Sequence, residues 1–236
     1  MNHIVALSGG KDSTALALRL AEVEPRDYIY VCTPTGNELP AMKEHWEKLG
    51  NRLGKKIVQP PGPTLEGLIQ IQKCLPNWRM RWCTRMIKLK PFEEFIRARV
   101  PCTVYVGIRA DEAGDREGVD YDAYDGVTRR FPMDEWGWQL QDVFDYLDLM
   151  QQTVPERTDC AFCFFQTLYE WYLLWLNEPE MWKLGEHYEQ WDWTHIPLCR
   201  TGYVACFNGW VSGTFRGWRR AERSSQETLR NVCGVR

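Results

Sequence analysis

The sequence contains no apolar run long enough to span a bilayer, and its first residues lack the charged-then-apolar order of a signal peptide. It also lacks an overall excess of basic residues, since the formal net charge is -3. We therefore expect a cytoplasmic protein with no membrane partner. Contact with nucleic acid would have to come from a local basic patch.

Cysteine and tryptophan, by contrast, are abundant. The 236 residues include 9 cysteines and 12 tryptophans, and 44% of the chain is hydrophobic, which suffices for a sizeable core. In a reducing cytosol, cysteines in a Cys-x-x-Cys arrangement are more typical of metal ligands or redox groups than of disulfides.

The first half of the chain alternates strand-like and helix-like patterns. Strands are predicted at residues 4–7, 28–32, 55–59 and 103–108, and helices at residues 14–24, 40–53, 65–74 and 84–99. This alternation predicts an α/β fold with a Rossmann-like, mostly parallel sheet covered by helices on both faces. Ligands of such sheets bind at the carboxyl ends of the strands. We expect a nucleotide-binding domain at residues 1–155 and a helical, Cys- and Trp-rich cap with a tail at residues 156–236, packed together as one unit.

The most informative stretch lies between the first strand and the first helix, and it reads Ser8-Gly9-Gly10-Lys11-Asp12-Ser13. Glycines in such a turn let the backbone approach phosphate oxygens, while N–H groups and the helix dipole hold the charge. Lys11 adds a mobile positive charge, and Ser8 and Ser13 can donate their hydroxyls. The spacing is not that of a Walker motif. The stretch predicts a phosphate-binding turn, with a glycine-rich turn that binds nothing as the alternative.

This stretch resembles the signature of the PP-loop ATP pyrophosphatases, which cleave ATP between its α and β phosphates and transfer AMP to a substrate. The same superfamily includes the phosphoadenosine phosphosulfate (PAPS) reductases, and further segments resemble PAPS reductase-like proteins. These segments are Thr35-Gly36-Asn37-Glu38-Leu39-Pro40, Arg81-Trp82-Cys83-Thr84 with Lys88 and Pro91, Gly107-Ile108-Arg109-Ala110-Asp111-Glu112 with Arg116, and Phe131-Pro132-Met133-Asp134-Glu135-Trp136 with Asp142-Val143. Together they imply an adenine nucleotide alpha hydrolase-like fold over residues 4–165.

The resemblance implies ATP as the ligand. We expect the turn and Lys11 to hold the β and γ phosphates, with Arg109 or Arg116 as a second positive contact. Asp12 is expected either to hold Mg²⁺, with ATP oxygens completing the metal shell, or to cap the helix. Arg109 and Glu112 are alternatively a surface ion pair. The remaining nucleotide contacts are expected from Thr35, Gly36 and Gly107.

Cys160 and Cys163 form a Cys-x-x-Cys pair, and Cys83 lies upstream of it. Soft thiolates suit a [4Fe-4S] cluster, and four thiolates would also suit Zn²⁺. The spacing resembles that of iron-sulfur adenosine phosphosulfate reductases, but Thr84 stands where the second cysteine of their first pair would be. We therefore expect the fourth ligand to be Cys199, or else Cys206. Buried, inert cysteines are the alternative.

The last part of the chain is aromatic. Helical spacing at residues 166–177 and 181–191 predicts a helical cap with an aromatic core stripe. Farther on, aromatic and basic residues alternate, which is typical either of a nucleic-acid contact or of a solvated basic face. These residues are Trp210, Arg216, Trp218, Arg219, Arg220 and Arg223.

Cys233 is a candidate nucleophile near the end of the chain. PAPS reductases end near a Glu-Cys-Gly-(Leu/Ile)-His segment whose cysteine attacks the substrate sulfur, and here Cys233-Gly234 is retained without the glutamate or histidine. The Ser8–Ser13 turn is intact, whereas reductases usually alter it because their substrate has no β and γ phosphates. An intact turn therefore favours ATP over PAPS.

Three functions follow from these observations. The first, which we favour, is ATP-dependent adenylylation of a substrate with pyrophosphate release, for sulfur insertion into a nucleic acid with the help of a sulfur donor. The second is a sulfonucleotide reductase that uses Cys233 and a thioredoxin-like reductant. The third is a nucleotide-binding accessory protein, since PAPS reductase-like proteins also occur in phages and beside plasmid-borne CRISPR loci.

Overall fold

The computed structural model describes residues 1–77, 79–114 and 124–189, and in it the chain divides into two compact units. The first unit comprises residues 1–64 and 82–160, and the second comprises residues 65–81 together with the described residues from 161 onward. Within these described ranges, no helix has the length and apolar character needed to cross a membrane.

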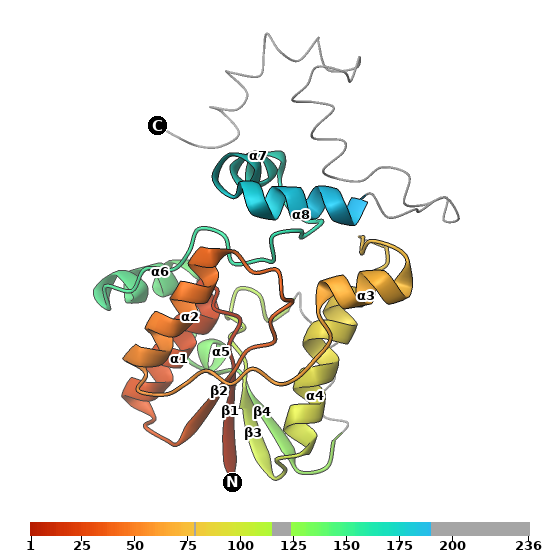
Figure 1. Cartoon of the computed structure of the whole chain (residues 1–236). Coiled ribbons are helices and arrows are strands. Elements are labelled where there is room, and N and C mark those ends of the chain that lie inside the picture. The colour runs from red at the N-terminus through yellow and green to blue at the C-terminus, as the bar shows by residue number, and fades with distance from the viewer. Residues whose placement is uncertain (78, 115–123, 190–236) are drawn as a thin grey trace. The chain divides into compact units, whose positions relative to one another are not determined.

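The first unit contains a four-stranded parallel sheet in the order β2-β1-β3-β4 (Figure 1). Val5 in β1 pairs with Tyr30 in β2 on one side and with Tyr105 in β3 on the other. All four carboxyl ends therefore lie at one edge, as the alternating pattern predicts. The strands are β1 (Asn2–Ala6), β2 (Tyr28–Val31), β3 (Cys102–Tyr105) and β4 (Val127–Arg130).

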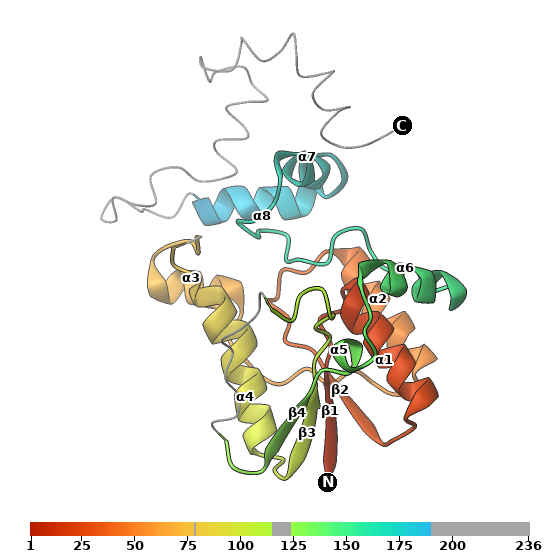
Figure 2. The same ribbon diagram turned by 180° about the vertical axis from the view of Figure 1, so that it is seen from behind.

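Helices cover both faces of this sheet (Figures 1 and 2). One face packs against α1 (Lys11–Val23), α2 (Pro40–Arg52) and α6 (Leu140–Leu149), and α5 (Pro132–Glu135) connects β4 to α6. The other face packs against α4 (Lys90–Arg97) through Phe95 and Ile96. The central strand is buried on both faces at Ile4 and Val5, which are fully inaccessible, and this fits the apolar run from Ile4 to Leu7. The predicted α/β fold with a mostly parallel sheet is confirmed.

Residues 55–59 differ from the expected strand. They form a single parallel bridge between Val58 and Val31, in which Val58 N donates to Tyr30 O at 2.7 Å and Cys32 N donates to Val58 O at 3.0 Å. The following residues, Pro60 and Pro61, carry no N–H, so the pairing cannot continue beyond them.

The helix expected over residues 84–99 is two segments. A π-helix, η1 (Thr84–Leu89), precedes α4, and Lys90 N donates to Arg85 O five residues earlier. The wider turn lies directly before Pro91, which has no N–H to offer to a carbonyl in the preceding turn. Such π segments occur frequently at functional sites.

The second unit consists of α3 (Leu65–Gln72), α7 (Leu168–Asn177) and α8 (Pro179–Glu189). Thr167 and Glu170 form a capping box that starts α7. The indole rings of Trp171 and Trp182 meet edge to face at 6.3 Å, and both are buried. The expected aromatic core therefore exists between α7 and α8, as their helical spacing predicts.

Candidate functional site

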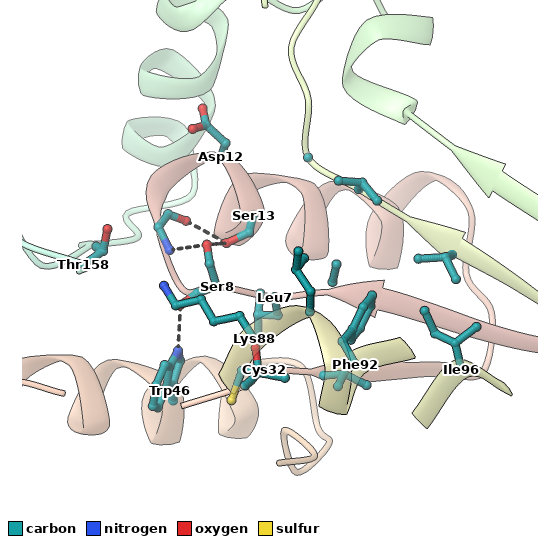
Figure 3. Close-up of a pocket in the computed structure, with 18 of the residues that line it drawn as sticks. Leu7, Ser8, Asp12, Ser13, Cys32, Trp46, Lys88, Phe92, Ile96 and Thr158 are labelled. Atoms are coloured by element: carbon teal, nitrogen blue, oxygen red, sulfur yellow. Dashed lines mark hydrogen bonds between the residues drawn. The ribbon is translucent and has the colours of Figure 1, made fainter. Parts of the chain in front are cut away.

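A cavity of about 400 Å³ opens at the carboxyl ends of the strands in the first unit (Figure 3). Ser8, Gly10 and Ser13 of the predicted phosphate turn line it, together with Thr33 after β2 and Gly107 after β3. The parallel topology thus brings three segments from different parts of the chain to one place, as we expect for this class of sheet.

Gly9 gives the turn its shape. Its φ is +87°, a conformation that side chains other than glycine rarely adopt. A Cβ atom added at Gly9 would lie 2.2 Å from Met42 Cε and 2.4 Å from Trp46 Nε1. The same indole donates from Nε1 to the carbonyl oxygen of Ser8 at 3.2 Å. Helix α2 therefore supports the turn closely from behind, and only glycine fits at this position.

The two serines of the turn bond to its backbone. Gly9 N donates to Ser13 Oγ at 3.0 Å, and Gly10 N donates to Ser8 Oγ at 3.2 Å. The two hydroxyl oxygens are themselves 3.0 Å apart. The amides and hydroxyls that would contact a phosphate are consequently held together in one small group at the start of α1.

Gly10 is the N-cap of α1, and because it has no side chain it cannot cap the helix with a side-chain hydrogen bond. The N-terminal end of the helix, where the dipole is positive, therefore lies at the cavity. Asp12 lies within the first turn, so the alternative that Asp12 caps the helix is wrong.

Arg109 is almost fully buried, with 6% of its surface exposed. Its guanidinium contacts the carboxylates of Asp12 at 2.8 Å, Asp111 at 2.9 Å and Glu112 at 2.8 Å. The hydrogen bonds that Arg109 donates to Asp111 raise the pKa of Arg109 above its usual value, and they lower the pKa of Asp111. The pair with Glu112 exists, and in it the arginine is buried while the glutamate is half-buried. The positive charge of Arg109 is thus balanced within the protein.

Two lysines lie near the turn. Lys11 Nζ is 3.4 Å from Asp12 Oδ2. Lys88, which belongs to η1, lines the cavity, and Figure 3 shows its side chain extended, with the amino group on the side where Ser8 and Trp46 lie. We assigned no role to Lys88 from the sequence. Its signal in the sequence is its place, with Pro91, in a segment that resembles PAPS reductase-like proteins.

Thr35 and Gly36 support the site from a second turn. The carboxylate of Glu38 accepts hydrogen bonds from Thr35 Oγ1 at 2.7 Å and from Gly36 N at 3.0 Å. Glu38 itself lines the cavity. The structure therefore places the acidic residue at the cavity and uses Thr35 and Gly36 to orient it.

Among the predicted metal ligands that lie within the described residues, Cys160 alone lines the cavity, and it forms an antiparallel bridge with Glu38. Cys32, which follows β2, lines it too. Burial raises the pKa of the Cys32 thiol to about 12, so this thiol stays protonated at neutral pH.

Cys83, Cys160 and Cys163 are the proposed metal ligands that lie within the described part of the chain. No group of three or more His, Cys, Asp or Glu residues within residues 1–77, 79–114 and 124–189 is placed to hold a metal ion. The prediction of an iron-sulfur cluster or Zn²⁺ is therefore not supported there.

Several predicted residues lie outside the described ranges, namely Arg116, Cys199, Cys206, Cys233 and the Arg/Trp-rich segment of residues 210–223.

Residues 2–156 match the family model of the phosphoadenosine phosphosulfate reductase domain. One uncharacterized protein of Methanocaldococcus jannaschii is 30% identical over 115 residues, which are 48% of this chain and 24% of that protein. A second from the same organism is 27% identical over 169 residues, 67% of this chain and 40% of that protein. The chain thus spans less than half the length of each relative.

The fold is similar to that of phosphoadenylyl-sulfate (PAPS) reductase from Candida auris, solved as a phosphate complex. The TM-score is 0.51 at 15% sequence identity, and the alignment covers 66% of this chain and 76% of that one. This likeness concerns the fold alone.

Proposed function

We propose, because the chain belongs to the phosphoadenosine phosphosulfate reductase domain family, that it binds ATP at the Ser8–Ser13 turn and transfers AMP to a substrate. The observation that carries the proposal is the complete Ser-Gly-Gly-Lys-Asp-Ser turn at the start of α1, beside a cavity of about 400 Å³. A sulfonucleotide has no β and γ phosphates for such a turn to hold.

The hydrogen bonds of the turn support this choice of ligand. Gly9 N and Gly10 N donate to the hydroxyls of Ser13 and Ser8, which are neutral acceptors. A phosphate oxygen carries negative charge and is a stronger acceptor than a hydroxyl. It can therefore replace the hydroxyls as the acceptor of the hydrogen bonds from these amides. The released hydroxyls can then donate to neighbouring phosphate oxygens, and the dipole of α1 adds to the attraction.

Lys88 is the cation that we assign to the phosphates. Arg109 is less suited to this role because three carboxylates already surround its guanidinium. Lys88 lines the cavity on a long, flexible side chain that can follow a ligand. Lys11 adds a second positive charge at the same helix terminus.

Asp12 fits a role at Mg²⁺, since its side chain is 23% exposed and it lines the cavity. Mg²⁺ commonly takes one or two carboxylates and completes its shell with waters and phosphate oxygens. When bound, the ion would neutralise charge on the phosphates.

In the proposed reaction, a substrate oxygen attacks the α phosphorus of ATP. The bond from this phosphorus to the bridging oxygen breaks, and pyrophosphate leaves with the electron pair. A sulfur or nitrogen nucleophile then displaces AMP from the activated substrate. Cys160 at the cavity favours the sulfur version, with a sulfur donor and a nucleic acid as the acceptor.

The second candidate function is reduction of a sulfonucleotide. The family to which the chain belongs supports this function. In that case the thiolate of Cys233 would attack the substrate sulfur, and a thioredoxin-like reductant would regenerate the enzyme.

Titration calorimetry with ATP and with PAPS, combined with assays for pyrophosphate and sulfite, separates these functions. Pyrophosphate release that depends on an acceptor substrate supports adenylylation. Sulfite release from PAPS that is lost in Cys233→Ser supports the reductase instead. Tight ATP binding without turnover would leave a nucleotide-binding accessory protein.

A further inference from the structure

We propose that His45 is a positioning residue for the phosphate turn, which it holds through Thr14 and Gly9 in the conformation that binds phosphate. The inference rests on the proposed function, because it concerns how the same turn is held ready. His45 lies on α2, behind the turn and away from the cavity lining, so it acts through other residues.

The geometry starts with one face of α2. Met42, His45 and Trp46 are spaced three and four residues apart and are all buried, so this face packs toward the turn. Met42 and Trp46 occupy the space beside Gly9, and Trp46 also bonds to the Ser8 carbonyl. His45 makes the third contact from the same face.

His45 Nε2 lies 3.1 Å from the hydroxyl oxygen of Thr14, and both residues are buried. The same hydroxyl donates to the carbonyl oxygen of Gly9 at 3.4 Å. Because this hydroxyl has a single proton, donation to Gly9 leaves its oxygen to accept from an imidazole N–H. The result is a short chain of bonds that runs from α2 through α1 to the centre of the turn.

This arrangement fits a neutral imidazole. Burial lowers the pKa of His45, the charge of Lys48 lowers it further, and a hydrogen bond to the Gly9 backbone partly opposes both. Lys48 on α2 is the charged side chain that acts on His45 within the described residues, while Thr14 from α1 is neutral. Protonation would place a positive charge in a buried site without a carboxylate among these contacts, which is unfavourable. We expect the turn to rearrange when His45 is protonated, so phosphate affinity should fall as the pH decreases through the folded-state pKa of His45, below 6.5.

The test compares ATP affinity by calorimetry at pH 5.5 and 7.5 in wild type and in His45→Gln. Glutamine keeps a neutral donor but does not titrate in this range. We expect wild-type affinity at pH 7.5 in His45→Gln, but a smaller loss at pH 5.5 than wild type shows. Protonation of ATP itself affects both proteins equally and cancels in their ratio. His187→Gln, a change at an exposed histidine of α8, should keep the wild-type pH profile.

Thr14→Val provides a second test that retains His45. It removes the hydroxyl at nearly constant shape, and we expect about fivefold weaker ATP binding at pH 7.5, the change that corresponds to one lost hydrogen bond. Identical pH profiles in wild type and His45→Gln, or unchanged affinity in Thr14→Val, would overturn the role of His45 while leaving ATP binding intact. Absence of ATP binding by the wild-type protein would instead overturn the proposed function, and this inference with it.

Discussion

Arg109 and Asp12 are 97 positions apart in the chain, yet Nη1 of the arginine donates to Oδ1 of the aspartate at 2.8 Å. This ion pair joins the segment after β3 to the first turn of α1. Asp111 and Glu112 share the same guanidinium, so one buried cation holds three carboxylates near the phosphate turn. Removing that cation should leave these carboxylates to repel one another.

We therefore predict that Arg109→Gln lowers the free energy of unfolding by about 3 kcal/mol, the effect typical of breaking a buried ion pair. Urea denaturation monitored by tryptophan fluorescence measures this change. The control is Lys48→Gln, which removes an exposed pair with Glu44 and should change the free energy by less than about 1 kcal/mol. Equal effects of the two substitutions would show that the Arg109 network does not stabilise the fold.

Gly9→Ala should abolish ATP binding. The new methyl group would overlap Trp46 Nε1, and alanine is unfavourable at a φ of +87°. Gly54→Ala is a matched control, because Gly54 has a φ of +65° but open space around it. It should destabilise the protein by roughly 1–2 kcal/mol through the backbone alone and leave ATP affinity unchanged. Calorimetry measures the ATP affinity of both variants. Normal ATP binding by Gly9→Ala would contradict our description of the turn.

Lys88→Ala should weaken ATP binding about tenfold or more, since a hydrogen bond between charged groups contributes roughly 1.5–3 kcal/mol. Lys90→Ala, two positions later at the start of α4, removes an exposed lysine and should have little effect. Lys11→Ala should also weaken binding, because its charge lies at the same helix terminus. If Lys90→Ala were as damaging as Lys88→Ala, general electrostatic attraction would account for both results.

Cys160 should be protected from alkylation by ATP, because it lines the cavity. We expect iodoacetamide to modify Cys160 at pH 7.5 and ATP to slow the reaction, as measured by peptide mass spectrometry. Cys32 and Cys102 are buried, and burial raises the pKa of both thiols, so they should remain unmodified in the folded protein. An unchanged rate at Cys160 in saturating ATP would place the nucleotide elsewhere.

Much of the fold was predictable because its signals are local. A short apolar run, a glycine-rich turn and an amphipathic helix each depend on neighbouring residues, so β1, the Ser8–Ser13 turn and α1 could be located from their own sequence. The strand expected at residues 55–59 is only a single bridge to β2, because Pro60, Pro61 and the partner strand limit its backbone pairing. The π-helix before Pro91 was missed because its hydrogen bonds shift by only one residue from those of an α-helix.

The alternating fold and the turn at the carboxyl end of β1 can be predicted from short segments, because glycine conformation, apolar patterning and strand-to-helix order are local properties. Which charges are balanced and which face the cavity depends instead on contacts between distant parts of the chain. Arg109 is neutralised by Asp12 from 97 residues away, Lys88 reaches the cavity from a π-helix, and His45 contacts Thr14 from a separate helix. The physical reason is that the electrostatic and hydrogen-bonding role of a side chain depends on the partners that folding brings within a few ångströms, and these come from distant parts of the chain.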